Sequence, residues 1–212
     1  SLPVSSPDQA TNWVDWWVSE RDLNYSDFMA SEFLPGREFA YQSLWQNGQL
    51  VVGQARERLE YMFGFPSPSG QSSSATITRT VAEPFVDDLA QSAILAIDDR
   101  PHGVFCVDMK NAADGTPRVT EINAGRFFTT SNFFAHAGLN MPRMLISAAQ
   151  GENLRPLGSS PLEPDLYWVR MVDMGFKLVT GDEIDRWAGP PRPGPGRFSD
   201  PGPWWPSPSL GI

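Results

Sequence analysis

Cysteine, histidine and lysine are all scarce in this sequence. The single cysteine, Cys106, excludes an intrachain disulfide and a cysteine-based zinc site. The two histidines, His102 and His136, stand far apart in the chain. Lys110 and Lys177 are the only lysines beside fourteen arginines, so few lysines are available to bind phosphate groups.

Long apolar runs and an excess of positive charge are also missing. No apolar stretch approaches the length that crosses a bilayer, no signal peptide opens the chain, and the formal net charge is −9. We therefore expect a cytoplasmic protein that binds neither membranes nor nucleic acids. Its 212 residues, 41% of them hydrophobic and 19% charged, are enough for one domain with a substantial core.

Helical and extended patterns alternate along most of the chain. Residues 5–20 predict a helix with Ser6 as its N-cap and Pro7 in its first turn. The Asn47-Gly48 pair predicts a tight hairpin between strands at 37–46 and 49–60. Apolar spacing predicts a second helix at 83–98, and it predicts that each helix buries one stripe of apolar side chains. In the first helix the stripe consists of Ala10, Trp13, Val14, Trp17 and Val18. In the second helix it consists of Phe85, Val86, Leu89, Ala93, Ile94 and Ile97.

The remaining elements complete an α+β domain over residues 1–188, with an antiparallel sheet flanked by helices. A third helix is predicted at 142–150, and a mobile loop at 65–74. Further strands are predicted at 27–34, on both sides of an Asp-Gly turn within 103–123, and at 165–173 with a continuation at 177–180.

The C-terminal segment 189–212 differs from the rest in composition. It contains eight prolines and five glycines, and we expect it to be disordered because it offers little to pack. Trp204 and Trp205 leave an alternative, in which the segment lies across an apolar surface of its own chain or a neighbour's.

The strands within 103–123 bring oxygen-bearing side chains onto one face. A two-residue turn at 114–115 places Asp108 directly opposite Glu121. The same register places Asn123 opposite Cys106, and alternation puts these side chains on one face of the hairpin. Asp108, Glu121 and Asn123 are therefore expected to converge.

Two carboxylates that lie this close repel each other unless a cation lies between them. Magnesium prefers oxygen ligands and usually takes one or two carboxylates together with phosphate oxygens and water. We therefore favour a site for Mg²⁺ or Mn²⁺ at Asp108, Glu121 and Asn123 over an exposed acidic hairpin with solvated charges. Lys110 lies on the same face, and Arg126 follows the second strand closely.

Two motifs in a fixed order carry a family resemblance. "EFLPGRE" at 32–38 is followed by a long hairpin and a helix, and then by "VD", whose Asp108 precedes the glutamate of "EIN" by thirteen residues. Over about residues 1–180 this order resembles the ATP-grasp superfamily, above all its carbamoyl-phosphate-synthase-like and amino-acid ligase branch. Enzymes of this superfamily join a carboxylate to an amine, or another nucleophile, through an acyl phosphate made from ATP.

The resemblance implies a role for each matching residue. Asp108, Glu121 and Asn123 match the magnesium ligands that hold the phosphates of ATP. The "SEFL" segment matches the hinge between two ATP-binding lobes, where the backbone of Glu32 and Leu34 would contact adenine.

Other matches concern the ribose and the reacting groups. Glu38 matches the acid that accepts the ribose hydroxyls, and Arg126 matches the arginine that steadies the transferred phosphate or the acyl phosphate. Further candidates for contacts with anionic groups, with ordinary surface charge as the alternative for the arginines, are Arg56, Arg58, Arg79 and Lys110.

One half of the family pattern has no counterpart here. A full ATP-grasp enzyme carries, ahead of these motifs, a substrate-shaping domain and a small lobe with a phosphate-binding lysine and a Gly-rich loop. No such loop precedes Gly36 and no lysine precedes Lys110. We therefore expect the C-terminal part of an ATP-grasp protein, either a fragment or one piece of a split protein, which is inactive by itself and lacks the N-terminal lobe.

Two classes of function stand at this point. The first is the ATP- and Mg-binding portion of an ATP-dependent carboxylate–amine ligase, with a small-molecule acid and amine as substrates. The second is a non-catalytic nucleotide-binding or protein-interaction module that retains the fold. The sequence does not identify the acid or the amine, and a homodimer remains open.

Overall fold

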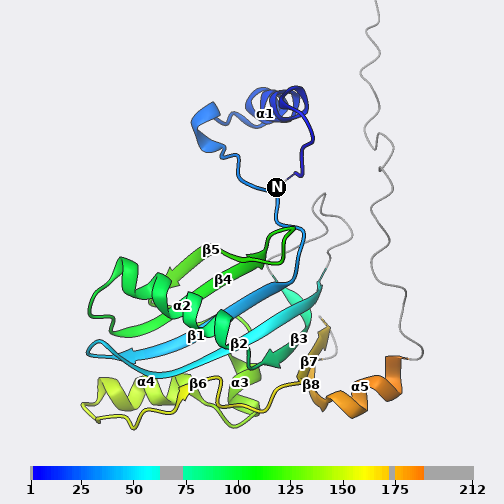
Figure 1. The fold of residues 1–212 in the computed structure, drawn as a ribbon. Coiled ribbons are helices and arrows are strands. Elements are labelled where there is room, and N and C mark those ends of the chain that lie inside the picture. Colours follow the sequence, from blue (N-terminus) through cyan, green and yellow to red (C-terminus); the bar gives the residue numbers. More distant parts are fainter. Residues whose placement is uncertain (1, 63–73, 172–174, 189–212) are drawn as a thin grey trace, which may run out of the picture.

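A single eight-stranded sheet organises the chain in the computed structural model, which describes residues 2–62, 74–171 and 175–188. Its strands follow the order β5-β4-β1-β2-β3-β7-β8, and the short β6 pairs in parallel with β2 (Figure 1). All other pairings are antiparallel. The strands are β1 (Glu38–Gln46), β2 (Gln49–Tyr61), β3 (Ala75–Val81), β4 (Gly103–Asn111), β5 (Pro117–Ala124), β6 (Gly158–Ser159), β7 (Leu166–Met171) and β8 (Gly175–Thr180).

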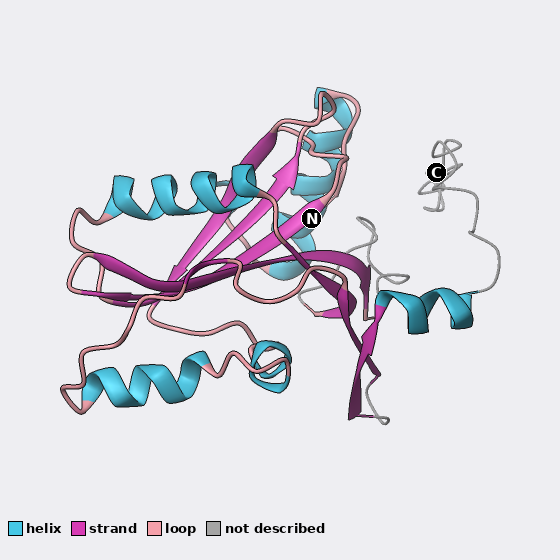
Figure 2. Ribbon diagram, turned by 60° about the horizontal axis from the view of Figure 1, so that its bottom comes forward, coloured by secondary structure: helices cyan, strands magenta, loops and turns pink. Residues whose placement is uncertain are grey.

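Helices cover both faces of this sheet. Figure 2 shows α2 (Pro84–Ile97) on one face, and α3 (Asn132–His136) with α4 (Met141–Ala149) on the other. Each layer has its own apolar core, and the predicted α+β class with an antiparallel sheet is confirmed. Within the described ranges, every helix is too short or too polar to cross a lipid bilayer.

The helix α2 packs through a stripe that is rotated from the predicted one. Val86, Ala90 and Ile94 are fully buried against β1 and β4, whereas the side chains of Phe85 and Ile97 are 44% and 59% exposed. The prediction was wrong for these two residues because Phe85 points to a different side of the helix from this stripe and Ile97 is the last residue of the helix. The expected helix itself is confirmed to within a residue.

The hairpin predicted at Asn47-Gly48 is confirmed. Both turn residues have positive φ angles, 54° and 87°, as a type I′ turn requires, and β1 pairs with β2 directly on either side. A bulge between Leu44 and Trp45, at Val51, then shifts the pairing by one residue, and the register beyond this bulge aligns the polar side chains described below.

The helix predicted near the N-terminus forms as α1 (Pro7–Arg21). Ser6 caps it by accepting a hydrogen bond from the backbone N–H of Gln9, at 3.2 Å. The predicted buried stripe is wrong, because no residue of α1 is fully buried. The helix lies apart from the sheet in Figure 1, and Trp13 packs instead against Trp17 and Phe28.

The strand predicted at 27–34 is also wrong. A 3₁₀ turn, η1 (Tyr25–Asp27), is followed by a segment that pairs with no strand of the described sheet. Its apolar side chains find little cover, since Met29 is 90% and Phe33 61% exposed. An extended segment becomes a strand only where a neighbouring strand accepts its hydrogen bonds.

The C-terminal part forms a hairpin in place of one long strand. The segment predicted to continue the strand at 165–173 turns back, so that β8 pairs antiparallel with β7. The helix α5 (Gly181–Ala188) follows β8. Most of the predicted loop at 65–74 and the whole segment 189–212, with Trp204 and Trp205, lie outside the described residues.

Candidate functional site

The hairpin of β4 and β5 has the register that the sequence predicts. Asp108 lies opposite Glu121, and Cys106 lies opposite Asn123. The turn itself differs from the prediction, because the backbone N–H of Ala112 donates to Thr116, at 2.8 Å, and the loop holds three residues. The one-residue offset is removed by a bulge between Asp108 and Met109, at Thr120.

Polar side chains form three rows across one face of the sheet. The strand registers align Arg58, Glu38 and Lys110 in the first row, and Gln54, Gln42, Cys106 and Asn123 in the third. The middle row contains Arg56, Ala40, Asp108 and Glu121. Because side chains alternate between the two faces of a sheet, all three rows point to the same side, which we call the polar face.

Arg58 is the centre of an ion network on the polar face. Its guanidinium donates to Oε1 of Glu38 at 2.8 Å and to Oδ1 of Asp108 at 2.6 Å. Each of these three side chains is only 15% exposed. The Nζ atom of Lys110 approaches Oε2 of Glu38 at 3.7 Å. Glu38 and Lys110, both predicted site residues, are therefore brought together with Asp108.

The surroundings of Asp108 disfavour its ionised form. Burial raises the pKa of Asp108 above its ordinary value, and the positive charges of Arg58 and Arg56 offset this only in part. The neighbouring Glu121 adds to the rise because a second negative charge lies close by. The positive charges of Arg58 and Arg56 therefore favour the ionised form of Asp108 against the effect of burial.

Arg126 lies next to the predicted metal ligands. Its Nε atom donates to Oδ1 of Asn123 at 3.2 Å, and a second guanidinium nitrogen donates to the same oxygen. Gly125, with a φ angle of 80°, makes the turn that brings Arg126 back over the end of β5. Both Arg126 and Glu121 are exposed, so this end of the polar face is open to solvent.

Arg56 is buried beneath the segment that follows Arg126. Its guanidinium carbon lies 4.7 Å from the ring centre of Phe128 and 5.4 Å from that of Phe134. The guanidinium carbon of Arg58 also lies over the ring of Phe128, 5.5 Å from its centre. The backbone N–H of Phe128 donates to the side chain of Gln42 at 3.3 Å. Phe128 was not predicted as a site residue, although it stands two residues after Arg126.

The donor set at Asp108, Glu121 and Asn123 fits magnesium. Two carboxylates and one amide oxygen on one face are the hard oxygen ligands that this ion takes, with phosphate oxygens and water in the remaining positions. Among the described residues there is no group of three or more His, Cys, Asp or Glu side chains that could hold a metal alone. A metal at this site would therefore depend on oxygen atoms from a ligand.

The predicted hinge residues lie in the segment before β1. Glu32 is exposed and Leu34 is half-buried, and the segment joins the sheet where the N–H of Gly36 donates to Asn111 at 3.0 Å. Across the described part of the chain, the Glu32 side chain makes no hydrogen bond or ion pair with the polar face. The contact between this segment and adenine stays a prediction.

Arg79, predicted as a further anion contact, lies on the opposite face. There Glu57 accepts hydrogen bonds from Arg37 at 2.8 Å and from Arg79 at 2.8 Å, and Arg79 also binds Asp165 at 3.0 Å. Burial would raise the pKa of Glu57, but the two arginines hold it below its ordinary value. Arg79 is therefore not brought together with Asp108, because odd-numbered residues of β3 point away from the polar face, and its contact with an anion stays a prediction.

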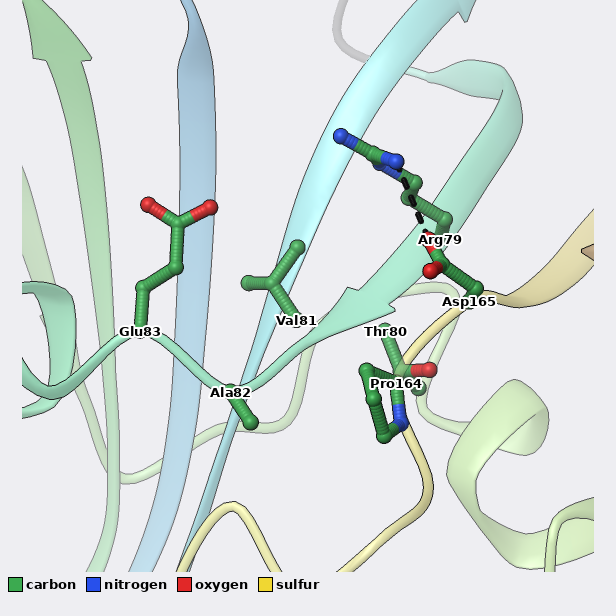
Figure 3. Close-up of a pocket in the computed structure, with 7 residues that line it drawn as sticks. All are labelled: Arg79, Thr80, Val81, Ala82, Glu83, Pro164 and Asp165. Atoms are coloured by element: carbon green, nitrogen blue, oxygen red, sulfur yellow. Dashed lines mark hydrogen bonds and ion pairs between the residues drawn. The ribbon is translucent and has the colours of Figure 1, made fainter.

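A pocket of about 250 Å³ lies beside this second ion cluster, where β3 leads into α2. Figure 3 shows Arg79 and Asp165 on one side of it and Glu83 on the other. Because both acids and the arginine are already engaged in ion pairs, the cluster fastens the start of α2 and of β7 to β2.

Comparison with known proteins gives a similarity of fold. No protein-family model matches the sequence, and the search of curated proteins gave no significant match. Among solved structures, the chain is similar to the biotin carboxylase domain dimer of 2-oxoglutarate carboxylase from Hydrogenobacter thermophilus, in complex with MgADP, ADP and bicarbonate. The TM-score is 0.52 and the sequence identity 13%. The match covers 76% of this chain and 35% of that one.

Two further structures match with lower scores. An ATP-grasp superfamily protein from Archaeoglobus fulgidus has a TM-score of 0.44 and 14% identity, over 70% of this chain and 47% of that one. The L-amino acid ligase from Bacillus licheniformis has a TM-score of 0.42 and 19% identity, over 64% of this chain and 35% of that one. The chain thus spans less than half the length of each of these structures, and the similarity, at 13–19% identity, is one of fold alone.

Proposed function

We propose that this chain carries the ATP- and Mg-binding face of an ATP-dependent carboxylate–amine ligase that acts through an acyl phosphate. The observation that carries the proposal is the opposed pair of Asp108 and Glu121, with Asn123 on the same face. The fold similarity to a domain whose structure contains MgADP supports it.

Phosphoryl transfer requires positioning and neutralisation of charge more than covalent catalysis. Asp108, Glu121 and Asn123 would hold Mg²⁺ or Mn²⁺, which neutralises phosphate oxygens when it is bound. Arg126 is open to solvent beside these ligands and would compensate the charge that develops on the transferred phosphate.

The nucleotide itself would lie along the first row of the polar face. Glu38 would accept the ribose hydroxyls, Lys110 would contact a phosphate, and the backbone of Glu32 and Leu34 would contact adenine. Glu38 and Lys110 lie close enough to act on one ligand, since their charged atoms are 3.7 Å apart. A separate N-terminal lobe would close over the triphosphate and select the acid and the amine.

Calorimetric titration of the chain with ATP, in the presence and absence of magnesium, tests the proposal. Glu121→Gln should weaken magnesium-dependent binding by at least tenfold, because a neutral amide replaces a charged ligand. Glu152→Gln is the matched control, since it removes one exposed carboxylate beyond the opposite end of β1. Normal magnesium-dependent binding by Glu121→Gln would refute the assignment.

One observation favours the second candidate, a non-catalytic module that retains the fold. Arg58 already bonds to Asp108 and Arg126 to Asn123, so two of the three ligands have partners within the chain. In such a module these contacts would be permanent, and ATP would bind equally well with and without magnesium, or not at all. The titration above therefore separates the two candidates.

A further inference from the structure

Arg56 is a buried cation that forms no ion pair with a carboxylate among the described residues. Only 2% of the residue is exposed, and its Nη1 atom makes a long hydrogen bond to the carbonyl oxygen of Thr130, at 3.5 Å. Its Nε atom is buried without a hydrogen-bond partner in the described part of the chain. A guanidinium has five N–H donors, and Nε–H is one that could bind an anion.

Such an arrangement is unfavourable for the protein by itself. Burial lowers the pKa of Arg56 to about 9, and the side chain is therefore still positively charged at pH 7. The rings of Phe128 and Phe134 compensate only part of the charge, because a cation–π contact is weaker than an ion pair. A bound anion would offset the unfavourable burial of the remaining charge.

A second unpartnered group lies on the neighbouring strand. Thr78 is fully buried, and its Oγ1 atom also lacks a hydrogen-bond partner among residues that the structure describes. The register places Thr80 opposite Arg56, so Thr78 lies one diagonal step away on the same face. A hydroxyl and a guanidinium together provide the donors that one small anion would need.

We propose that Arg56 and Thr78 form a subsite for the carboxylate of the acid substrate. The inference rests on the proposed function, because it names the residues that hold one of the two substrates of that reaction. Arg56 stands in the same row as Asp108, two strands away, which corresponds to about 10 Å between their backbones. The carboxylate would therefore lie beside the metal ligands, within reach of a phosphate held there.

The chemistry of the surroundings favours a carboxylate over a phosphate. The planar fork of an arginine matches the two oxygens of a carboxylate, and the two phenylalanine rings suit the apolar part of an organic acid. Phe128 belongs to the irregular segment between β5 and α3, and its ring is only half-buried. Entry of the acid would require this ring to move away from Arg56.

An NMR titration of the full chain with sodium acetate tests the proposal directly. The Nε–H resonance of Arg56 should move in a saturable manner, and sodium chloride at equal ionic strength should leave it unchanged. A resonance that does not respond to acetate would overturn the proposal, and so would one that responds to inorganic phosphate but not to acetate.

Variants provide an independent test. Arg56→Lys should weaken acetate binding at least tenfold, because an ammonium group lacks the bidentate geometry, whereas the exposed control Arg143→Lys should bind acetate as the wild type does. Unchanged acetate binding by Arg56→Lys would refute the subsite. Failure here is distinct from failure of the proposed function, since the acetate titration contains neither ATP nor magnesium and does not depend on Glu121.

Discussion

Replacement of Asp87 by asparagine should make the protein more stable at neutral pH. Asp87 lies in α2, is 7% exposed, and accepts a hydrogen bond from Ser160 Oγ at 3.0 Å. In the part of the chain that the structure describes, no arginine or lysine forms an ion pair with it. Burial raises the pKa of Asp87 from 3.8 to about 6, and the negative charge of Asp88 adds to the rise.

The size and sign of the effect follow from this shift. A rise of about two pKa units corresponds to about 3 kcal/mol of unfavourable free energy in the ionised, folded state. Because the folded protein binds the proton more tightly, stability from this group is present below pH 4 and is lost as the pH rises through 6. Asparagine imitates the neutral acid and can still accept the hydrogen bond from Ser160.

Urea unfolding at two pH values measures the effect. Asp87→Asn should gain about 1 to 3 kcal/mol at pH 7, and about half as much at pH 5, where the folded carboxyl is already largely protonated. Asp88→Asn, a change of the same chemistry at the exposed neighbour, should alter stability by less than about 0.5 kcal/mol. A loss of stability in Asp87→Asn at pH 7, or a gain that does not depend on pH, would refute the reasoning.

Three further outcomes are expected. Gly53→Ala should lower the free energy of unfolding in urea by about 1–3 kcal/mol or more, because the new Cβ would lie 1.8 Å from the Oη atom of the buried Tyr41; an unchanged midpoint would contradict this packing. A chain ended at Ala188 should lose less than about 2 kcal/mol in thermal unfolding, because residues 189–212 are rich in proline and glycine, and a larger loss would show that their tryptophans pack on the domain. The isolated chain should release no phosphate from ATP with magnesium and mixed amino acids, and turnover that disappears in Asp108→Asn would disprove this.

Local sequence signals were sufficient for elements whose partners lie next to them in the chain. The Asn47-Gly48 turn determines the existence of the β1–β2 hairpin, because only a few residue pairs adopt two successive positive φ angles. It does not determine the whole register, because a bulge at Val51 shifts the pairing by one residue. The helix α2 is likewise confirmed from its apolar period, although the period left open which side chains would be deepest. Such signals act over a few residues and require no knowledge of the rest of the fold.

Elements that depend on distant partners could not be obtained in this way. The apolar stripe on α1 and the apolar residues at 27–34 are both present in the sequence, yet neither packs on the sheet in the structure. The reversal between β7 and β8 and the short helix α3 also lack a strong local signal. Burial is decided by what the remaining chain brings alongside, and a single sequence does not report that.

The predicted pairing of Asp108 with Glu121 is confirmed, but it depends on a bulge that the sequence did not predict. The three-residue loop at 113–115 shifts the pairing by one residue, which alone would turn Glu121 and Asn123 away from Asp108. The bulge at Thr120 shifts it back, and the Thr120 hydroxyl donates to the Asp108 carbonyl at 3.0 Å. The three-residue loop and the bulge compensate each other, and together they place Glu121 opposite Asp108 and Asn123 opposite Cys106.

The arginines of the polar face bear on both candidate functions. Asp108 is too deeply placed to keep its charge without a cation, and Arg58 supplies that cation at 2.6 Å. A metal that bound Asp108 would take over this role, and Arg58 would then be free to meet the negative charge of a phosphate. Under the proposed function, binding of a magnesium–nucleotide complex would thus exchange one cation for another, and the charge of Asp108 would stay compensated. In a non-catalytic module no such exchange occurs, and the ion pair between Arg58 and Asp108 would instead hold β2 to β4 across β1.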